Sequence, residues 1–100
     1  MKYAELKKVG KLVAENDVYD GFIYLYTDKI WKLGNRYFAH NEHPNSNRYT
    51  GKTGTMELRL YKAGDLVEYM VRFGFKLENL TKQGKEILSE SDLEYLEWYS

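Results

Sequence analysis

The feature that most constrains the fold of this chain is a change in apolar spacing within its first half. Across residues 2–15, apolar side chains recur at three- and four-residue intervals, as at Leu6, Val9 and Val13, which predicts an amphipathic helix. From Val18 to His40 the chain becomes rich in aromatic and β-branched residues, which are typical of strands. The first half therefore predicts a helix followed by a sheet.

Short turn signals divide the strand-forming stretch into three parts. Phe22–Tyr26 is expected to form a strand, Thr27–Lys29 a turn, and Ile30–Leu33 a partner strand. Gly34-Asn35 is a second turn signal, and it leads into a strand over Arg36–His40. We expect these segments to form an antiparallel meander.

The segment Asn41–Gly54 has no aliphatic side chain and contains the only proline, three asparagines and two glycines. Such a composition predicts a long exposed loop, and long loops in compact domains are often functional. After it, Met56, Leu58 and Leu60 alternate with polar or aromatic residues, the period of a half-buried strand. The sheet is therefore expected to have about four strands.

The C-terminal part of the chain has the spacing and capping residues of helices. Asp65–Phe73 has a helical apolar pattern, and Gly74 is expected to end it in a left-handed conformation. Thr81 and Ser91 are expected to cap the helices that follow. The predicted fold is α+β, a single compact domain over residues 1–100, with an N-terminal helix, an antiparallel sheet and C-terminal helices packed on one face.

Length and cysteine content limit the class of protein. One hundred residues suit one domain, and the absence of cysteine excludes disulfides, thiolate nucleophiles and sulfur-ligated metals. No apolar run approaches the ~20 residues that span a bilayer, and the first residues lack the apolar segment of a secretory signal. We therefore expect a soluble cytoplasmic protein without a membrane partner.

Charge is distributed unevenly along a chain that is neutral overall. The 15 basic and 15 acidic side chains cancel, but residues 29–62 contain seven basic and two acidic groups. Residues 86–100 contain five acidic groups and no basic ones. The basic block coincides with the most aromatic part of the chain, so it is a candidate binding surface.

Interleaved rings and cations suit macromolecular recognition. Tyr and Arg anchor many protein interfaces, and the same pair can stack on bases and neutralise phosphates. If Ile23, Leu25 and Phe38 face inward, strand alternation turns the neighbouring tyrosines outward. The alternative is that the rings fill the core and the charges only solvate its rim. The candidate binding residues are Tyr24, Tyr26, Trp31, Arg36, Tyr37, Arg48, Tyr49, Lys52 and Arg59.

Two stretches also resemble a nuclease signature. The run Tyr49-Thr50-Gly51-Lys52-Thr53, with Arg59 after it and Gly21-Phe22-Ile23-Tyr24 before it, resembles the motif of the GIY-YIG nucleases. The resemblance implies that Tyr24, Tyr49 and Arg59 surround a scissile phosphate. It also implies that a later carboxylate, Glu90, Glu94 or Glu97, holds a divalent metal.

The two histidines lie close together in His40-Asn41-Glu42-His43, a composition that can bind a divalent ion. On a strand, however, His40 and His43 would point to opposite faces, and Pro44 disfavours the helical turn that would align them. We therefore expect solvated polar side chains here and no metal site.

Taken together, these features predict a small non-catalytic binding protein of the inhibitor or adaptor type, without a cofactor. Its predicted surface is the basic aromatic sheet face with the 41–54 loop. A protein partner is favoured over nucleic acid because zero net charge and an acidic C-terminus oppose a general nucleic-acid footprint. Such a partner could itself handle nucleic acid. The acidic C-terminal helix could also pair two copies of the chain.

Overall fold

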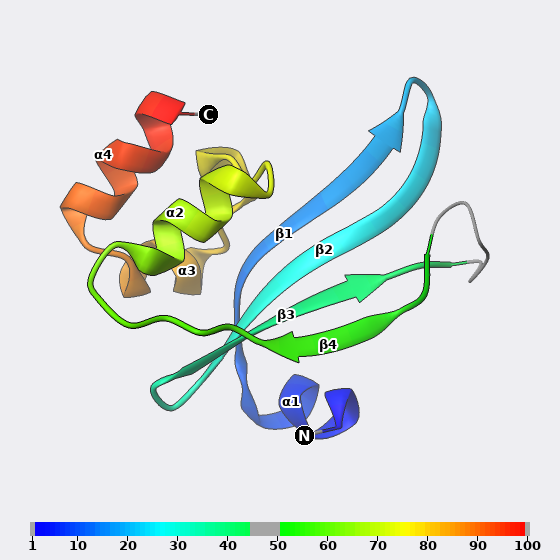
Figure 1. Ribbon diagram of the computed structural model, residues 1–100, viewed down its shortest axis with the longest axis horizontal. Helices are drawn as coiled ribbons and strands as arrows, with labels where there is room; N and C mark the ends of the chain where they lie inside the picture. The colour runs from blue at the N-terminus through cyan, green and yellow to red at the C-terminus, as the bar shows by residue number, and fades with distance from the viewer. Residues whose placement is uncertain (1, 45–50, 100) are drawn as a thin grey trace.

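The computed structural model describes residues 2–44 and 51–99. A short helix precedes four antiparallel strands that lie side by side in the order of the sequence (Figure 1). This confirms the predicted α+β class, the N-terminal helix and the sheet of four strands. The elements are α1 (Tyr3–Val9), β1 (Lys11–Asp20), β2 (Ile23–Leu33), β3 (Arg36–Glu42) and β4 (Gly54–Glu57).

The C-terminal helices pack on one face of the sheet, as predicted. They are α2 (Asp65–Arg72), the 3-10 turn η1 (Leu77–Asn79), α3 (Lys82–Ile87) and α4 (Glu90–Tyr99). Gly74 ends the α2 region with φ +81°, the left-handed value expected for this position. Thr81 caps α3, because its Oγ1 accepts a hydrogen bond from the Gly84 amide at 2.9 Å.

The two faces of the sheet are covered by different helices. On β2, Ile30 joins the main core beneath the C-terminal helices, whereas its neighbour Trp31 points to the opposite face. There Trp31 packs with Phe38 of β3 and Leu6 of α1 in a smaller cluster. Both faces are therefore buried near the end of the sheet where β2 meets β3. The far end, where β1 turns into β2, projects beyond the helices (Figure 1).

The N-terminal helix is shorter than the sequence predicts. It ends at Val9, and Lys11–Glu15 form the start of β1 instead of a further helical turn. Every residue of β1 from Lys11 to Asp20 except Val13 has a register partner on β2. This non-local pairing outweighs the local helical spacing, because propensity is a weaker determinant than sheet formation with an adjacent strand.

The turn predicted at Thr27–Lys29 is wrong, because these residues lie in the middle of the continuous strand β2. Asp28 pairs with Asn16 on β1 and with Asn41 on β3, so it occupies a central strand. Polar side chains are tolerated there because they meet polar partners: Thr27 donates to Asp17 Oδ1 at 2.6 Å.

Three further boundaries differ from the predictions. β3 continues to Glu42, so the connection to Gly54 is shorter at its start than expected. β4 ends at Glu57, although the Leu58 amide still donates to the Tyr37 carbonyl at 2.8 Å. The helix cap predicted at Ser91 lies at Ser89, whose Oγ accepts from the Asp92 amide at 3.2 Å. Such end shifts follow from tertiary contacts that sequence spacing does not encode.

Candidate functional site

The aromatic residues predicted to bind do not share one open face. Trp31 is only 7 % exposed and lies beneath α1, whereas Tyr37 is partly buried against the main core on the other face. The expectation that Tyr37 faces outward is therefore wrong. Tyr26 is also half-buried, with its ring 4.8 Å from that of His43. Both faces of the sheet are covered at these positions, whereas the alternation of side chains along the strands predicted one exposed aromatic face.

The predicted alternation of inward and outward side chains also fails near the start of β2. Ile23, which was expected to face inward, is 66 % exposed. The pairing of β1 with β2 shifts by one residue at this point. Tyr24 and Thr27 would lie on opposite faces of a regular strand, yet the Tyr24 hydroxyl is 2.5 Å from Thr27 Oγ1. A bulge explains both findings, because one extra residue reverses the inside-outside pattern beyond it.

The predicted cations are spread over the molecule. Arg36 is engaged by Glu57, with which it forms two hydrogen bonds of 3.0 and 2.7 Å. Arg59 and Lys52 are exposed in segments that flank β4. Arg48 and Tyr49 lie outside the described residues. The positive charge of Arg36 is thus already neutralised within the chain.

The geometry separates two residues that the nuclease resemblance would bring together. Arg59 follows β4, whose last residue Glu57 pairs with Phe38, and Phe38 pairs with Trp31. Tyr24 is seven residues from Trp31 along β2, a distance of about 23 Å in a strand. Arg59 also lies outside any helix. Tyr24 and Arg59 therefore cannot surround one phosphate in this conformation.

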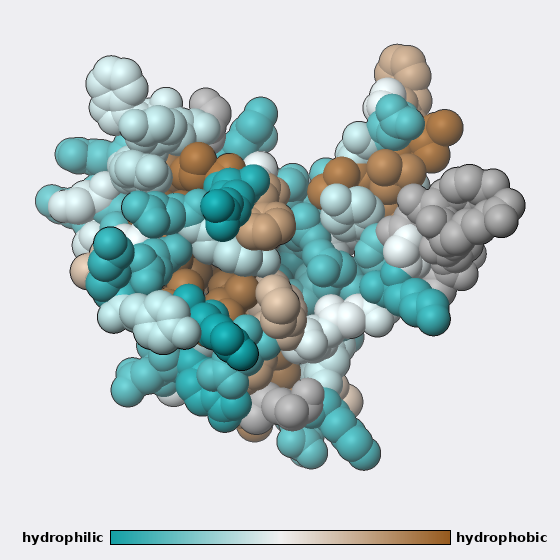
Figure 2. Space-filling view, in the orientation of Figure 1, coloured by the Kyte–Doolittle hydropathy of each residue, from teal (hydrophilic) through white to brown (hydrophobic). Residues whose placement is uncertain are grey.

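Exposed apolar side chains gather instead at the end of the β1–β2 hairpin. Phe22 in the connecting turn is fully exposed, and Tyr19, Ile23 and Tyr24 beside it are exposed as well. We call these four residues the hairpin tip. Figure 2 shows hydrophobic side chains, coloured brown, along the projecting part of this hairpin. A cluster of this kind on a projecting element is unusual for a surface without a partner.

The projecting hairpin is acidic as well as aromatic. Residues 15–28 contain four acidic side chains and no basic one. Sequence reasoning missed this feature because it assigned residues 2–15 to a helix and paired Phe22–Tyr26 with Ile30–Leu33, so it predicted no strand over residues 11–20. The acidic residues could be read from the sequence, but the pairing of β1 with β2 could not. The four acidic residues are Glu15, Asp17, Asp20 and Asp28.

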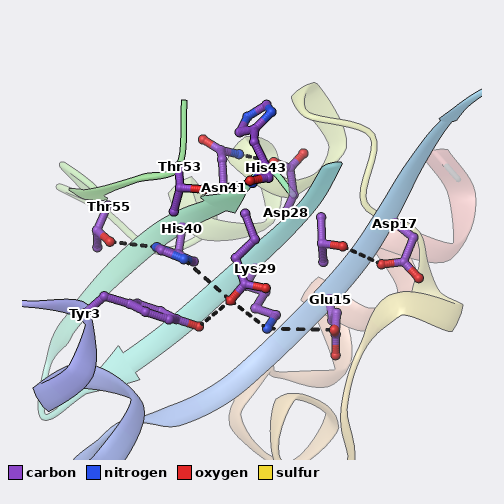
Figure 3. A network of polar contacts seen from close by, with 12 residues as sticks. Tyr3, Glu15, Asp17, Asp28, Lys29, His40, Asn41, His43, Thr53 and Thr55 are labelled. Carbon is purple, nitrogen blue, oxygen red and sulfur yellow. Dashed lines mark hydrogen bonds and ion pairs between the residues drawn. The ribbon is translucent and has the colours of Figure 1, made fainter. Parts of the chain in front are cut away.

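A network of polar contacts fixes α1 to the sheet (Figure 3). The Tyr3 ring stacks on the His40 ring with centroids 3.4 Å apart and planes 4° apart. The Tyr3 hydroxyl donates to Glu42 Oε1 at 3.1 Å, and Lys29 Nζ donates to the same oxygen at 3.0 Å. His40 Nδ1 lies 2.7 Å from Thr55 Oγ1, so the network reaches β4.

Burial affects the ionisation of the two central groups of this network. Burial lowers the pKa of His40, and the nearby Glu42 carboxylate only partly opposes that change. Burial alone would raise the pKa of Glu42, but hydrogen bonds from Lys29 and Tyr3 outweigh it and leave this pKa lowered. With 2 % of its surface exposed, His40 has no room for a substrate. The network therefore joins α1 to strands β2, β3 and β4.

Acidification should weaken this part of the fold. Because the pKa of His40 is lower in the folded state, the unfolded chain binds more protons below the ordinary value of 6.5. We expect the free energy of unfolding to fall between about pH 7.5 and pH 5, before the carboxylates titrate. Urea denaturation at several pH values measures this dependence. The His40→Gln variant should be less stable at pH 7.5 but show a smaller slope, and an unchanged slope would contradict the assignment.

The two histidines lie in different surroundings, as strand alternation predicts. His40 contacts Tyr3 on the α1 face, whereas His43 lies beside Tyr26. Within residues 2–44 and 51–99, no three His, Asp or Glu side chains are arranged to hold a metal ion.

Comparison with known proteins identifies no relative. No protein-family model, curated protein or solved structure matches the chain. Of the helices in the described part of the chain, none has the length and apolar character needed to cross a bilayer. The function must therefore be inferred from the site itself.

Proposed function

We propose that this protein is a non-catalytic binding module whose hairpin tip inserts into a cleft on a protein partner. The observation that carries the proposal is the full exposure of Phe22 at the end of a projecting hairpin. Exposing a phenylalanine together with Tyr19, Ile23 and Tyr24 has a solvation cost of about 25 cal/mol per Å² of apolar surface. Burial of these side chains against a partner would remove this solvation cost.

The charge of the hairpin favours a protein partner over nucleic acid. Residues 15–28 have a formal charge of four negative units; Glu15 lies 4.0 Å from Lys29, but Asp17 and Asp20 near the tip would still repel a phosphate backbone. An acidic and aromatic projection is complementary to a basic cleft with apolar walls. Clefts that hold single-stranded nucleic acid have this chemistry, since they combine cations with stacking surfaces. Inhibition of a nucleic-acid-handling protein in the cytoplasm is therefore the mode of action we favour.

Internal contacts prepare the hairpin for binding. The Tyr24 hydroxyl, Thr27 Oγ1 and Asp17 Oδ1 form a chain of hydrogen bonds of 2.5 and 2.6 Å across β1 and β2. The Tyr19 and Tyr24 rings also contact each other edge to face, with centroids 5.7 Å apart. Binding through a preorganised element loses less conformational entropy than binding through a mobile loop.

The proposal is tested by capture from the native host with matched variants. We expect wild type to retain a specific protein, and Phe22→Ala to weaken its binding by at least ~30-fold, as at an interface hot spot. Calorimetry with the purified partner measures the affinity. Tyr61→Ala is the control, because Tyr61 is a highly exposed ring, at 84 %, in the segment between β4 and α2.

Two results would overturn the proposal. One is a partner that Phe22→Ala and Tyr61→Ala retain equally, because the tip would then make no special contact. The other is binding to single-stranded DNA or RNA with a steep dependence on salt, which would identify a direct nucleic-acid-binding module.

A further inference from the structure

A cavity of about 540 Å³ lies between the sheet and α2. Its walls come from β2, β3 and β4 on one side and from α2 and the residues just after it on the other. None of the candidate functions in the sequence analysis uses it. The residues that matter for its chemistry are Tyr26, Asp28, Asn41, His43, Tyr69 and Phe73.

Aromatic rings form opposing walls of this cavity. On α2, the rings of Tyr69 and Phe73 contact each other with centroids 4.4 Å apart. On the sheet, the ring of Tyr26 lies against that of His43, with centroids 4.8 Å apart. Phe73 is exposed although it borders the cavity. Ring faces carry partial negative charge, so such walls favour a cation between them.

Asp28 adds a formal negative charge to the same cavity. Its carboxylate accepts a hydrogen bond from the Asn41 amide nitrogen, and Figure 3 shows both side chains beside His43, apart from the Tyr3–His40 network. No Lys or Arg within residues 2–44 and 51–99 forms an ion pair with Asp28. Burial raises the pKa of Asp28, with the Asn41 hydrogen bond and His43 only partly opposing it.

The charge of Asp28 reaches both walls. Burial is the main reason that the pKa values of Tyr26 and Tyr69 are raised, and in each case the negative charge of Asp28 adds to the increase. Asp28 lies on β2 two residues from Tyr26, and both side chains border the cavity that Tyr69 of α2 also lines. Asp28 therefore occupies the position of a counter-ion for a group bound in the cavity.

We propose that this cavity binds an alkylammonium group, with Asp28 as counter-ion and the rings of Tyr26, Tyr69 and Phe73 as its aromatic walls. The charge of Asp28 disfavours an anion, and Lys29, which also borders the cavity, has its ammonium paired with Glu42 at 3.0 Å. A neutral apolar ligand would leave the Asp28 carboxylate further desolvated without compensation. His43 Nδ1 is buried and has no hydrogen-bond partner among the described residues, so a neutral His43 can accept an N–H from a primary ammonium. Quaternary ammonium groups such as that of choline have no N–H and would be held by the charge of Asp28 and the rings alone. This site is separate from the hairpin tip and does not depend on the proposed function.

The ammonium group could belong to a free amine or to a lysine side chain of a protein. Both present the same charge, and both have an alkyl stem that can contact the apolar residues Met56 and Phe75 in the cavity wall. The experiment therefore needs separate arms for the two sources.

The first arm compares choline with its neutral isostere 3,3-dimethyl-1-butanol by NMR titration of the wild-type chain. We expect choline to bind with a dissociation constant of about 1 mM or below, and the alcohol to bind at least ~10-fold more weakly. Chemical-shift changes should be largest at Asp28, Asn41 and Tyr69. This comparison needs no variant, so it is independent of any effect of mutation on folding.

Single substitutions then test Asp28 as the counter-ion and the Tyr69 ring as part of the aromatic wall. Asp28→Asn keeps the shape of the side chain and should weaken choline binding at least ~10-fold, because it removes the charge. Asp20→Asn removes the same charge from the exposed end of β1 and should leave choline binding unchanged. Tyr69→Leu should weaken binding, whereas Tyr69→Phe, which keeps the ring, should retain it.

The second arm uses n-butylammonium and an acetylated, amidated Gly-Lys-Gly peptide with and without trimethylation of the lysine. Binding of butylammonium but not of the peptides assigns the site to a free amine, and binding of either peptide assigns it to a lysine side chain. Equal affinity for choline and its neutral isostere, the absence of binding by all four cations, or unchanged binding in Asp28→Asn would overturn the proposal. Phe22→Ala should not alter any of these titrations, so a failure here is distinct from a failure of the hairpin.

Discussion

Replacing Gly84 by alanine is expected to lower the free energy of unfolding by about 3 kcal/mol or more. Gly84 lies in α3, which packs directly on β1. A Cβ atom at this position would stand 2.0 Å from the Val13 carbonyl oxygen and 3.0 Å from its carbon. Both are backbone atoms, so no side chain can rotate away to relieve the overlap.

Helix propensity alone would predict that Gly84→Ala raises the free energy of unfolding. Alanine favours a helix over glycine by up to ~1 kcal/mol, so a stabilised variant would show that α3 does not approach β1 this closely. Gly54→Ala is the matched control, because no atom lies within 4 Å of a Cβ at Gly54. Urea denaturation of both variants measures the difference. Thr81, whose hydroxyl donates to the Leu12 carbonyl at 2.5 Å, holds α3 at the same place.

Trp31→Ala is expected to destabilise the protein by about 3 to 5 kcal/mol, the range for removing a buried aromatic side chain. The Trp31 ring contacts Tyr3 edge to face with centroids 6.0 Å apart, and it packs with Leu6 and Phe38. Its removal would leave α1 without its main apolar contact. We expect α1 and the Tyr3–His40 stack to separate from the sheet before the main core unfolds.

The second tryptophan provides the control. Trp98 is 85 % exposed on α4, so Trp98→Ala should change stability by less than ~0.5 kcal/mol. The fluorescence of Trp98→Ala reports Trp31 alone and should be blue-shifted in the folded protein. A Trp31→Ala variant with unchanged stability but lost partner binding would instead place this ring on the interaction surface, as the sequence analysis expected.

Local signals in the sequence predicted the elements that local interactions determine. The helix Asp65–Arg72, its left-handed end at Gly74 and the cap at Thr81 all depend on residues within one or two turns. The extent of β1, in contrast, depends on contacts with a distant part of the chain. Lys11–Glu15 have the spacing of a helix, and only pairing with β2 across the hairpin makes them a strand.

The candidate site was harder to predict, because both faces of the sheet are used. Counting aromatic residues identified an aromatic segment of the sequence, but it could not show that Trp31 lies beneath α1 while Tyr37 lies under the C-terminal helices. The basic block was also misleading, since Arg36 meets a carboxylate 21 residues away at Glu57. The acidic character of residues 15–28 was readable from the sequence, but its importance depends on the hairpin that the fold creates.

The outer side of β1 is an edge of the sheet that is only partly covered. The Ala14–Leu80 bridge and the bond from the Thr81 amide to the Val13 carbonyl cover the beginning of this edge. In the part of the chain that the structure describes, no strand pairs with β1 on that side beyond Ala14. An open edge of this kind invites pairing with a second chain. Asp17 and Asp20 would repel the same residues of another copy, so their negative charge opposes edge-to-edge pairing and fibril-like stacking.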